Sequence, residues 1–520
     1  MPQITQFLRR AVKLNGKGTS TIFAGREQSW TDFADRAARL AGACAALGYK
    51  PGDRIGILAL NSDRYLESFF GLAWGGFIFV PINTRLAPPE IVFWLTDSGC
   101  SALLVDDTFT AVLPQVLPQT PDIRTIIHIG EAATPDGQLS YEALIAAAQP
   151  AADAGCRGDE VAGIFYTGGT TGRSKGVMLS HRNIVANAQN TLPATPLGRE
   201  TVYVHAAPMF HVADGALTFL VTGFGGTHVF LPRFDPLAFL RIVEDHRVTT
   251  TLIVPTMVNM VVNHPEMTTR DLSSLRGIVY GASPMPEAVI RRALEVMPQV
   301  RFTQAYGQTE ASPVMTLMPH EYHCFEGPLA GRMKSAGRAV FGCEIKIMDE
   351  NDNEVPRGTV GEVCGRGELV TVGYWKQPEL TAHTMRNGWL HTGDGGTMDD
   401  EGFVYIVDRV KDMIVSGGEN VYSAEVEAAL YDHPAVAECA VIGVPDDKWG
   451  ERVHAVVRLK PGMAATDAAL IAACHDRIAG YKCPRSVTIR EEPLPLSGAG
   501  KILKTELRKP YWEGREKRVN

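Results

Sequence analysis

The residue types most suited to binding phosphate are concentrated between residues 166 and 176. Glycine, threonine and serine alternate there with two cations, directly after the apolar run from Val161 to Phe165. The run predicts a buried strand, and glycine lets the backbone that follows approach a ligand closely. Backbone N–H groups of such a turn bind anions, hydroxyl groups donate further hydrogen bonds, and Lys175 adds a positive charge. The residues expected to hold phosphates are Thr167, Gly168, Gly169, Thr170, Thr171, Gly172 and Lys175.

The spacing within this loop differs from that of the Walker loop. In a Walker loop, lysine and then serine or threonine follow the second glycine directly. Here Arg173 and Ser174 separate Gly172 from Lys175. A flexible linker is the alternative that composition alone leaves open, because many linkers are rich in glycine, serine and threonine. By itself the loop predicts phosphate binding and does not identify a reaction.

Polar turns follow several other apolar runs further along the chain. His211 ends one such segment, Gly281, Ala282 and Ser283 end a second, and Tyr306 to Glu310 end a third. Ligands of open α/β sheets bind at the carboxyl ends of strands. We therefore expect these turns to share one cleft.

The elements that must position these turns alternate between helix and strand. Helical spacing from Trp30 to Leu47 leads into the strand Ile55 to Leu60, and the alternation continues, which predicts parallel β-α-β units. From Gly337 to Tyr405, short β-prone runs alternate with glycine turns, as in a small β-barrel or meander. The sequence from Lys411 onward resembles a separate small domain. The expected fold is α/β, with a large N-terminal domain of parallel sheets plus a small β-barrel, and a small C-terminal α+β domain.

Composition narrows the class of protein. The chain has 520 residues, 45% of them hydrophobic, and a formal net charge of −8 without a basic block, which argues against a nucleic-acid partner. Its nine cysteines include no CxxC pair and look like the reduced thiols of a cytoplasmic protein. No secretory signal opens the chain, and the most membrane-like run, Ser68 to Asn83, is too short to span a bilayer. Peripheral contact with a membrane stays open.

Taken together, and in their order, these motifs resemble those of the adenylate-forming enzyme superfamily. That superfamily includes acyl-CoA synthetases, luciferases and nonribosomal-peptide adenylation domains, and the likeness extends from about Phe7 to Lys509. The resemblance implies that a carboxylate attacks the α-phosphate of ATP and expels pyrophosphate, with magnesium, before CoA takes the acyl group. It also implies two domains: residues 1–409 bind AMP and the acyl group, and a mobile domain, residues 410–520, carries the catalytic lysine.

The resemblance assigns roles around the nucleotide. Thr309 matches the residue that hydrogen-bonds the α-phosphate, and Glu310 matches the magnesium ligand, a hard oxygen donor for a hard cation. Tyr306 matches the aromatic residue that stacks on adenine. The other residues expected at the nucleotide are Gly281, Ala282, Ser283 and Gly307. The structural alternatives are a capped helix start at Thr309 and Glu310, and a core position for Tyr306.

Further matches lie toward the C-terminus. Asp394 matches the carboxylate that accepts hydrogen bonds from both ribose hydroxyls, and Arg409 matches the cation that reaches ribose and phosphate. Lys411 falls on the family's hinge. Lys501 matches the mobile lysine that bridges the carboxylate and the α-phosphate during adenylation and then moves away. An Asp or Arg at a turn, or a lysine in a glycine-rich tail, is otherwise a solvated surface residue.

A thiol needs a narrow path to the adenylate in the second half-reaction. Gly417 and Gly418 resemble the segment beside which pantetheine passes, and Trp449, with Tyr481, lies where benzoate-ligase relatives contact CoA. Cys483 departs from that pattern, because some relatives have a basic residue there.

The acid itself is only broadly constrained by the sequence. His211 matches the residue at the mouth of the acyl pocket, and a core histidine is the structural alternative. Asp214 could meet a substrate hydroxyl or cap a helix. The expected pocket walls are apolar or small, with no arginine for a second carboxylate: Val212, Met257, Gly281, Gly307 and Met315. This favours a monocarboxylic acid, aliphatic or aryl.

The leading hypothesis is a cytoplasmic acyl-CoA ligase that uses ATP, Mg²⁺ and coenzyme A. The rivals are an acyl-AMP-forming enzyme that does not use CoA and an adenylate-binding sensor without turnover. A serine hydrolase is disfavoured, because the segment around Ser283 lacks the closing glycine of a nucleophile elbow. The oligomeric state stays open, with a homodimer among the options.

Overall fold

The computed structural model describes residues 2–167, 174–195, 197–409, 413–416, 419–446, 449–475, 477–497 and 502–513. The chain divides into two units, each described by itself. The first comprises Met1–Ala282, Val296–Ile345 and Gly365–Leu390, and the second comprises Ser283–Glu295, Lys346–Cys364 and His391–Asn520. The domain boundary expected between residues 409 and 410 stays a prediction.

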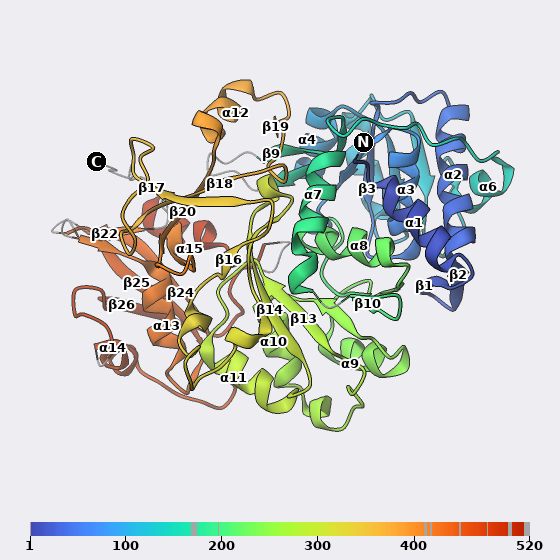
Figure 1. Cartoon of the computed structure of the whole chain (residues 1–520). Helices are drawn as coiled ribbons and strands as arrows, with labels where there is room; N and C mark the ends of the chain where they lie inside the picture. The colour runs from blue at the N-terminus through green and yellow to red at the C-terminus, as the bar shows by residue number, and fades with distance from the viewer. Residues whose placement is uncertain are drawn as a thin grey trace. The chain divides into compact units, whose positions relative to one another are not determined.

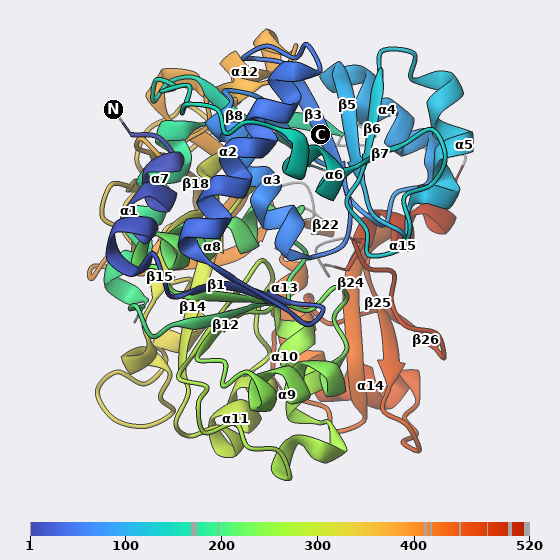
Figure 2. The ribbon, with the colours of Figure 1, turned by 90° about the vertical axis from the view of Figure 1, so that its right-hand side faces the viewer.

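An eight-stranded sheet of the first unit contains the strand that leads into the expected phosphate loop. Its order is β19-β9-β8-β4-β3-β5-β6-β7. In that order the strands are Gly373–Tyr374, Lys175–Ser180, Val161–Thr167, Ile78–Pro81, Arg54–Leu58, Cys100–Val105, Thr125–His128 and Leu139–Ser140. The pairs from β8 through β4, β3, β5 and β6 to β7 are parallel, whereas β9 pairs antiparallel with β8 and β19. Figure 2 shows β3, β5, β6 and β7 side by side. The expected parallel β-α-β units are confirmed.

A nine-stranded sheet carries the other polar turns of this unit. Its order is β16-β15-β14-β13-β12-β10-β11-β1-β2. In that order the strands are Arg338–Ala339, Val314–Met318, Arg301–Gly307, Gly277–Gly281, Thr250–Leu252, Val202–His205, Thr227–Phe230, Thr19–Phe23 and Arg26–Ser29. Because β10, β12, β13 and β14 are parallel, their carboxyl ends lie along one edge of the sheet.

Helices cover these two sheets. The helices with their residues in the first unit are α1 Thr5–Asn15, α2 Trp30–Ala46, α3 Asp63–Trp74, α4 Pro88–Ser98, α5 Leu113–Val116, α6 Tyr141–Ala147, α7 His181–Thr191, α8 Val212–Phe224, α9 Pro236–Asp245, α10 Pro255–Val262 and α12 Pro378–Thr384. Helix α2 packs beside α3 and α6 (Figure 1). Ser29, Ser62 and Ser180 each accept a backbone N–H bond at the start of a helix. Such caps stabilise a helix by about 1 kcal/mol.

The core of the first unit lies where α1, α2, α3, α7 and α8 contact the sheets. Trp30, Phe33, Phe69, Phe70 and Phe219 are buried there. The helical spacing of the apolar residues places the first four of these rings on the inward faces of α2 and α3, and Phe219 lies on α8. Each ring contributes about 1.5–3 kcal/mol through burial, so this helical layer is a rigid support for the turns at its edge.

The second unit contains most of a four-stranded sheet, of order β17-β18-β20-β21, in the region where a small barrel or meander is expected. These strands are Glu344–Met348, Gly361–Arg366, Leu390–Met398 and Val404–Arg409. A further sheet has the order β23-β22-β25-β24 with β26 on β25. Its strands are Glu419–Val421, Ile414–Ser416, Gly450–Leu459, Val436–Asp446 and Ser486–Arg490. The helices are α11 Glu287–Val296, whose last residue falls in the first unit, α13 Ser423–Tyr431, α14 Asp467–His475 and α15 Lys504–Trp512.

The sequence predicts reduced cysteines and an apolar run too short to span a bilayer. All nine cysteines are free thiols, and most of them are buried. A search of the described helices finds none with the length and hydrophobicity that a transmembrane span requires.

We expect His181 to make the stability of the first unit depend on pH. Its ring is buried, its Nδ1 accepts a hydrogen bond from the Ile4 backbone at 3.3 Å, and burial lowers its pKa to about 4. The unfolded chain therefore binds a proton near pH 6.5 that the folded chain does not bind until about pH 4. We expect the free energy of unfolding to fall as the pH is lowered through this range, by at most about 1.4 kcal/mol per pH unit from this histidine.

Urea denaturation of the wild type and His181→Gln at pH 7 and pH 5 measures this effect. The variant should be less stable at pH 7, and the gap should narrow at pH 5. An equal gap at both pH values would show that His181 does not carry the effect.

Candidate functional site

The expected phosphate loop joins β8 to β9. Thr167 and Lys175 are partners across this antiparallel pair, and both are half-buried. Gly168, Gly169, Thr170, Thr171 and Gly172 lie outside the described residues. The structure therefore places the two ends of the loop opposite each other, as a hairpin requires.

The Glu310 side chain contacts Tyr374, which also contacts Lys175 at the end of the loop, and the sequence does not reveal this arrangement. Its carboxylate is buried, and Oε1 accepts a hydrogen bond from the Tyr374 hydroxyl at 2.8 Å. The Lys175 ammonium lies 5.4 Å from the centroid of the Tyr374 ring. Tyr374 belongs to β19, which pairs with β9. One phenol ring thus contacts both the expected phosphate-binding cation and the expected metal ligand.

Burial, and then the neighbouring carboxylate of Glu310, raise the pKa of Tyr374 above its usual value. The phenol therefore stays protonated and donates a hydrogen bond to Glu310. The sequence alone gives no signal for Tyr374, because a Gly-Tyr pair in a β-rich region matches no functional pattern.

Thr309 and Glu310 lie in a short turn that the surrounding backbone holds firmly. The turn is a 3₁₀ helix, η5 Thr309–Ala311, with Gln308 rather than Thr309 in the capping position and no side-chain cap. The Glu310 carbonyl accepts a bond from Thr371 N at 2.8 Å. The buried Asn187 amide donates to the carbonyls of Ala311 and Val314, at 3.2 and 2.8 Å. These bonds fix the direction in which the Glu310 side chain leaves the backbone.

The ends of β13 and β14 show why glycine is needed there. A Cβ atom on Gly281 would lie 2.1 Å from the Ala305 carbonyl oxygen, and one on Gly307 would lie 1.9 Å from that of Pro313. Ala282 has a φ of 70°, and such strained backbone is concentrated at functional sites. Tyr306 is half-buried and packs against the apolar cluster that includes Met315. It is thus neither a fully buried core residue nor a solvated one.

His211 begins helix α8 and is half-buried, with its ring 4.5 Å from that of Phe210. Asn61 holds the segment that leads to it. The Asn61 amide donates to the carbonyls of His205, Ala207 and Leu231, and its oxygen accepts from Met209 N at 2.9 Å. An isolated asparagine carries no sequence signal, so Asn61 too was missed.

Asp214 is part of the interior of the first unit. Its carboxylate accepts a hydrogen bond from the Tyr203 hydroxyl at 2.7 Å and lies 2.6 Å from His205 Nδ1. All three side chains are buried. The carboxylate is therefore committed to this network, which disfavours the role toward a substrate hydroxyl.

In the second unit, Asp394 and Arg409 are partners across the antiparallel pair of β20 and β21. Asp394 is buried, and the turn before it is tied to β18. The Thr392 hydroxyl donates to the Val363 carbonyl at 2.6 Å, and Gly393 N donates to Glu362 at 2.8 Å. The sequence thus identified two residues, 15 positions apart, that the backbone brings opposite each other. Ser283, also in this unit, is half-buried.

Trp449 is half-buried, and the Arg485 guanidinium lies 4.8 Å from the centroid of its ring. Arg485 is exposed, so this pair offers an aromatic face and a cation together. Tyr481 is exposed, whereas Cys483 is buried in the core of the unit. Arg485 is thus a cation two residues away from Cys483 in the sequence.

Besides the five loop residues named above, four further expected residues lie outside the described part of the chain: Lys411, Gly417, Gly418 and Lys501. The side chain of Arg409 also lies outside it.

Comparisons with known proteins cover almost the whole chain. A family model described as AMP-binding enzyme matches residues 8–375, and one described as AMP-binding enzyme C-terminal domain matches residues 425–501. Feruloyl-CoA synthase of an Amycolatopsis species is 38% identical over 96% of this chain and 98% of its own length. The medium/long-chain-fatty-acid–CoA ligase FadD8 of Mycobacterium tuberculosis is 36% identical over 93% of this chain and 85% of its own length.

A solved structure extends the likeness to the fold. The anthranilate CoA ligase AuaEII, in complex with anthranoyl-AMP, matches with a TM-score of 0.89 and 28% identity, over 98% of this chain and 97% of its own. The resemblance on which the sequence analysis relied is confirmed. The chain belongs to the family of AMP-binding, adenylate-forming enzymes, in its acyl-CoA synthetase branch.

Proposed function

We propose that this protein is an ATP-dependent acid–CoA ligase. A carboxylate and ATP give acyl-AMP and pyrophosphate, and the CoA thiol then displaces AMP to give acyl-CoA. The observation that carries the proposal is the grouping of Lys175, Tyr374 and Glu310 at the end of the β8–β9 hairpin. The family and the names of the relatives support it.

The residues in this group fit a magnesium polyphosphate. Glu310 offers a hard carboxylate oxygen, the donor that Mg²⁺ prefers, and the Lys175 ammonium is a donor for phosphate oxygens. Mg²⁺, when bound, neutralises charge that develops on the phosphates. Tyr374 orients the Glu310 carboxylate by donating to one of its oxygens, and we assign Thr309, on the same turn, to the α-phosphate.

We assign the remaining nucleotide contacts to Gly281, Ala282, Ser283, Tyr306 and Gly307 for adenine, and to Asp394 and Arg409 for ribose. The tight packing at Gly281 and Gly307 supports a flat, closely fitted surface there. The cross-strand pairing of Asp394 with Arg409 supports a joint role for those two.

For the thiol step, we propose that residues 410–520 turn about Lys411 between the half-reactions. Lys501 then serves adenylation, and Gly417 and Gly418 lie beside the pantetheine path. Trp449, with Arg485 over its ring, is suited to a group that is both aromatic and anionic. The adenine nucleotide end of CoA is such a group.

We propose an apolar monocarboxylic acid as the substrate, with His211 at the mouth of its pocket. Val212, Met257 and Met315 are apolar and buried, and Asp214 is committed to the interior. The relatives include an aryl-acid and a fatty-acid ligase, so both classes belong in the test.

Pyrophosphate release from Mg·ATP tests the proposal, with acids from acetate to palmitate, benzoate and hydroxycinnamates, each with and without CoA. Turnover that requires CoA and yields a thioester supports the ligase and identifies the acid class. Adenylate formation indifferent to CoA would favour an acyl-AMP-forming enzyme. ATP binding without pyrophosphate release from any acid would favour a sensor.

Tyr374→Phe is expected to raise the Mg²⁺ concentration for half-maximal activity about tenfold. The variant removes a hydrogen bond to a charged carboxylate, a contact that is typically worth about 1.5–3 kcal/mol. Activity measured across a magnesium titration gives the shift. Tyr49→Phe is the matched control, since its hydroxyl bonds Ser101 and Thr125 in the same unit. An unchanged magnesium dependence in Tyr374→Phe would remove the proposed link between Tyr374 and the metal ligand.

A further inference from the structure

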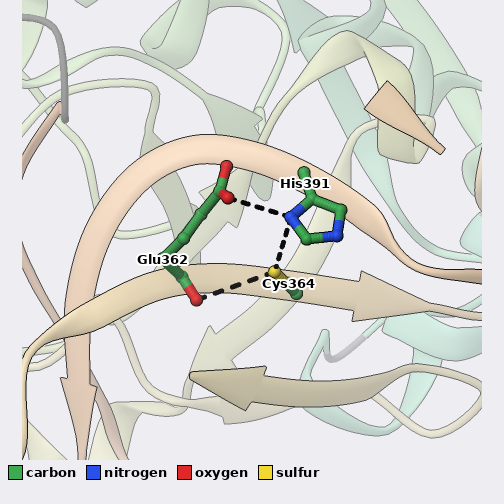
Figure 3. A group of neighbouring side chains, drawn as sticks. All are labelled: Glu362, Cys364 and His391. Carbon is green, nitrogen blue, oxygen red and sulfur yellow. Dashed lines mark hydrogen bonds and ion pairs between the residues drawn. The ribbon is translucent and has the colours of Figure 1, made fainter. Parts of the chain in front are cut away.

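Three metal-binding side chains of different chemistry converge in the second unit, and the proposed function uses none of them. Glu362 and Cys364 are two residues apart on β18 and so project from the same face of the sheet. His391 lies on the neighbouring strand β20. Figure 3 shows the carboxylate, the thiol and the imidazole directed toward one another. Their ligand atoms all lie within 4.8 Å of one another.

One atom of His391 is at the centre of this group. Its Nδ1 lies 2.9 Å from Glu362 Oε2 and 3.3 Å from Cys364 Sγ (Figure 3). A neutral imidazole nitrogen holds either one proton or one lone pair, so it forms one good hydrogen bond and not two. A cation between the three atoms would contact all of them at once.

The surroundings of the other ring nitrogen of His391, Nε2, also favour a cation at Nδ1. Nε2 is buried, makes no hydrogen bond within the described ranges, and lies 3.6 Å from Asp352 Oδ1. If Nδ1 held a cation, the ring proton would move to Nε2 and face this carboxylate. A carboxylate that receives the second N–H of a metal-bound histidine is the usual outer partner of such a site.

The remaining features suit a bound ion as well. Cys364 and His391 are buried, whereas Glu362 is half-buried and leaves a route to solvent. Gly393 N donates to the second carboxylate oxygen of Glu362 at 2.8 Å, which fixes the orientation of that ligand. The backbone of both β18 and β20 thus holds the proposed ligand side chains in position.

We propose that Glu362, Cys364 and His391 form a binding site for Zn²⁺, through Oε2, Sγ and Nδ1, with water as the fourth ligand. One sulfur, one nitrogen and one oxygen are ligands that zinc accepts in tetrahedral sites, and thiolate disfavours magnesium or calcium. On binding, the thiol proton passes to solvent, because zinc binds the thiolate. Nδ1 binds through its lone pair, and no electron transfer is involved.

Titration of the metal-free, full-length protein with Co²⁺, a spectroscopic substitute for zinc, tests the site. We expect one equivalent of Co²⁺ to produce a sulfur-to-cobalt charge-transfer band that Zn²⁺ abolishes. Cys364→Ser should lose the band, and His391→Gln should weaken Co²⁺ binding at least about 100-fold, beyond the usual loss of an outer partner. Cys483→Ser is the matched control, a buried cysteine of the same unit whose thiol bonds only backbone carbonyls among the contacts described, and it should keep the band.

A measurement on the wild-type protein avoids the ambiguity that a variant could lose the band because it misfolds. Zinc-edge X-ray absorption of the wild-type protein with one equivalent of Zn²⁺ should show one sulfur near 2.3 Å together with nitrogen or oxygen ligands near 2.0–2.1 Å. An absent charge-transfer band, a band that survives Cys364→Ser, or a zinc shell without sulfur would each overturn the proposal. The three side chains would then be a hydrogen-bonded cluster that ties β18 to β20.

Discussion

Glu310→Gln is expected to lower the rate of adenylate formation by about two to three orders of magnitude at saturating ATP and acid. The substitution keeps the size of the side chain but replaces the proposed metal-ligand charge with a neutral amide. Because the Tyr374 hydroxyl and the backbone around η5 hold this position, the variant should fold normally. Single-turnover measurement of acyl-AMP formation across a magnesium titration gives both the rate and the metal dependence.

Glu321→Gln provides the control for this experiment. Glu321 is an exposed carboxylate in the next 3₁₀ turn of the same unit, His320–Tyr322, and its loss should leave the rate unchanged. A rate for Glu310→Gln within a few-fold of the wild type would remove Glu310 from the proposed magnesium site.

Lys501→Ala is expected to separate the two half-reactions. Adenylate formation from acid and ATP should fall at least about 100-fold, because a cation that stabilises the charge in the transition state is lost. Conversion of added acyl-AMP and CoA to acyl-CoA should stay within a few-fold of the wild type, because the lysine is proposed to move away before that step. Two quenched-flow assays, one for each half-reaction, measure the separation.

Lys509, eight residues after Lys501 in the sequence, provides the control. Lys509 is an exposed lysine on α15, and Lys509→Ala should affect neither half-reaction. Equal losses in both half-reactions of Lys501→Ala would contradict the proposed alternation, since they would mean that the lysine serves both steps or that the domain is misfolded.

Local patterns in the sequence predicted much of the fold. The helical spacing after Trp30 corresponds to α2, and the apolar run from Val161 corresponds to β8. These features depend on neighbours within a few residues, so they can be read from a single sequence. The strand order could not be, because the pairing of β19 with β9 joins residues almost 200 positions apart.

The residues of the candidate site also fall into two groups: those that a single sequence identifies and those that it does not. Glu310, Lys175 and Asp394 were identified because they lie in recognisable motifs, and the resemblance assigned their roles. Tyr374, Asn61 and Asn187 were not, although Tyr374 and Asn187 hold Glu310 and its turn in place, and Asn61 holds the segment that leads to His211. Each acts through a long-range hydrogen bond, and a tyrosine or an asparagine with such a bond does not differ in sequence from one without it.

Asp214 shows that a nearby sequence position does not determine which way a side chain faces. Asp214 lies close to His211 in the sequence and therefore looked like a residue that could face substrate. In the fold, its carboxylate turns into the interior, toward Tyr203 and His205 on β10. Whether a side chain at the start of a helix faces a cleft or the core depends on which strand packs beneath it, and that is a tertiary property.

We propose that the acid is activated as an adenylate before CoA reacts. The most direct test mixes the wild-type protein with Mg·ATP and the best acid of the panel, without CoA, and quenches the reaction within one turnover for mass spectrometry. We expect acyl-AMP and pyrophosphate in amounts stoichiometric with the enzyme, and complete conversion of that acyl-AMP to acyl-CoA and AMP when CoA is added before the quench. Formation of acyl-CoA together with ADP and phosphate, or without any acyl-AMP, would contradict the account.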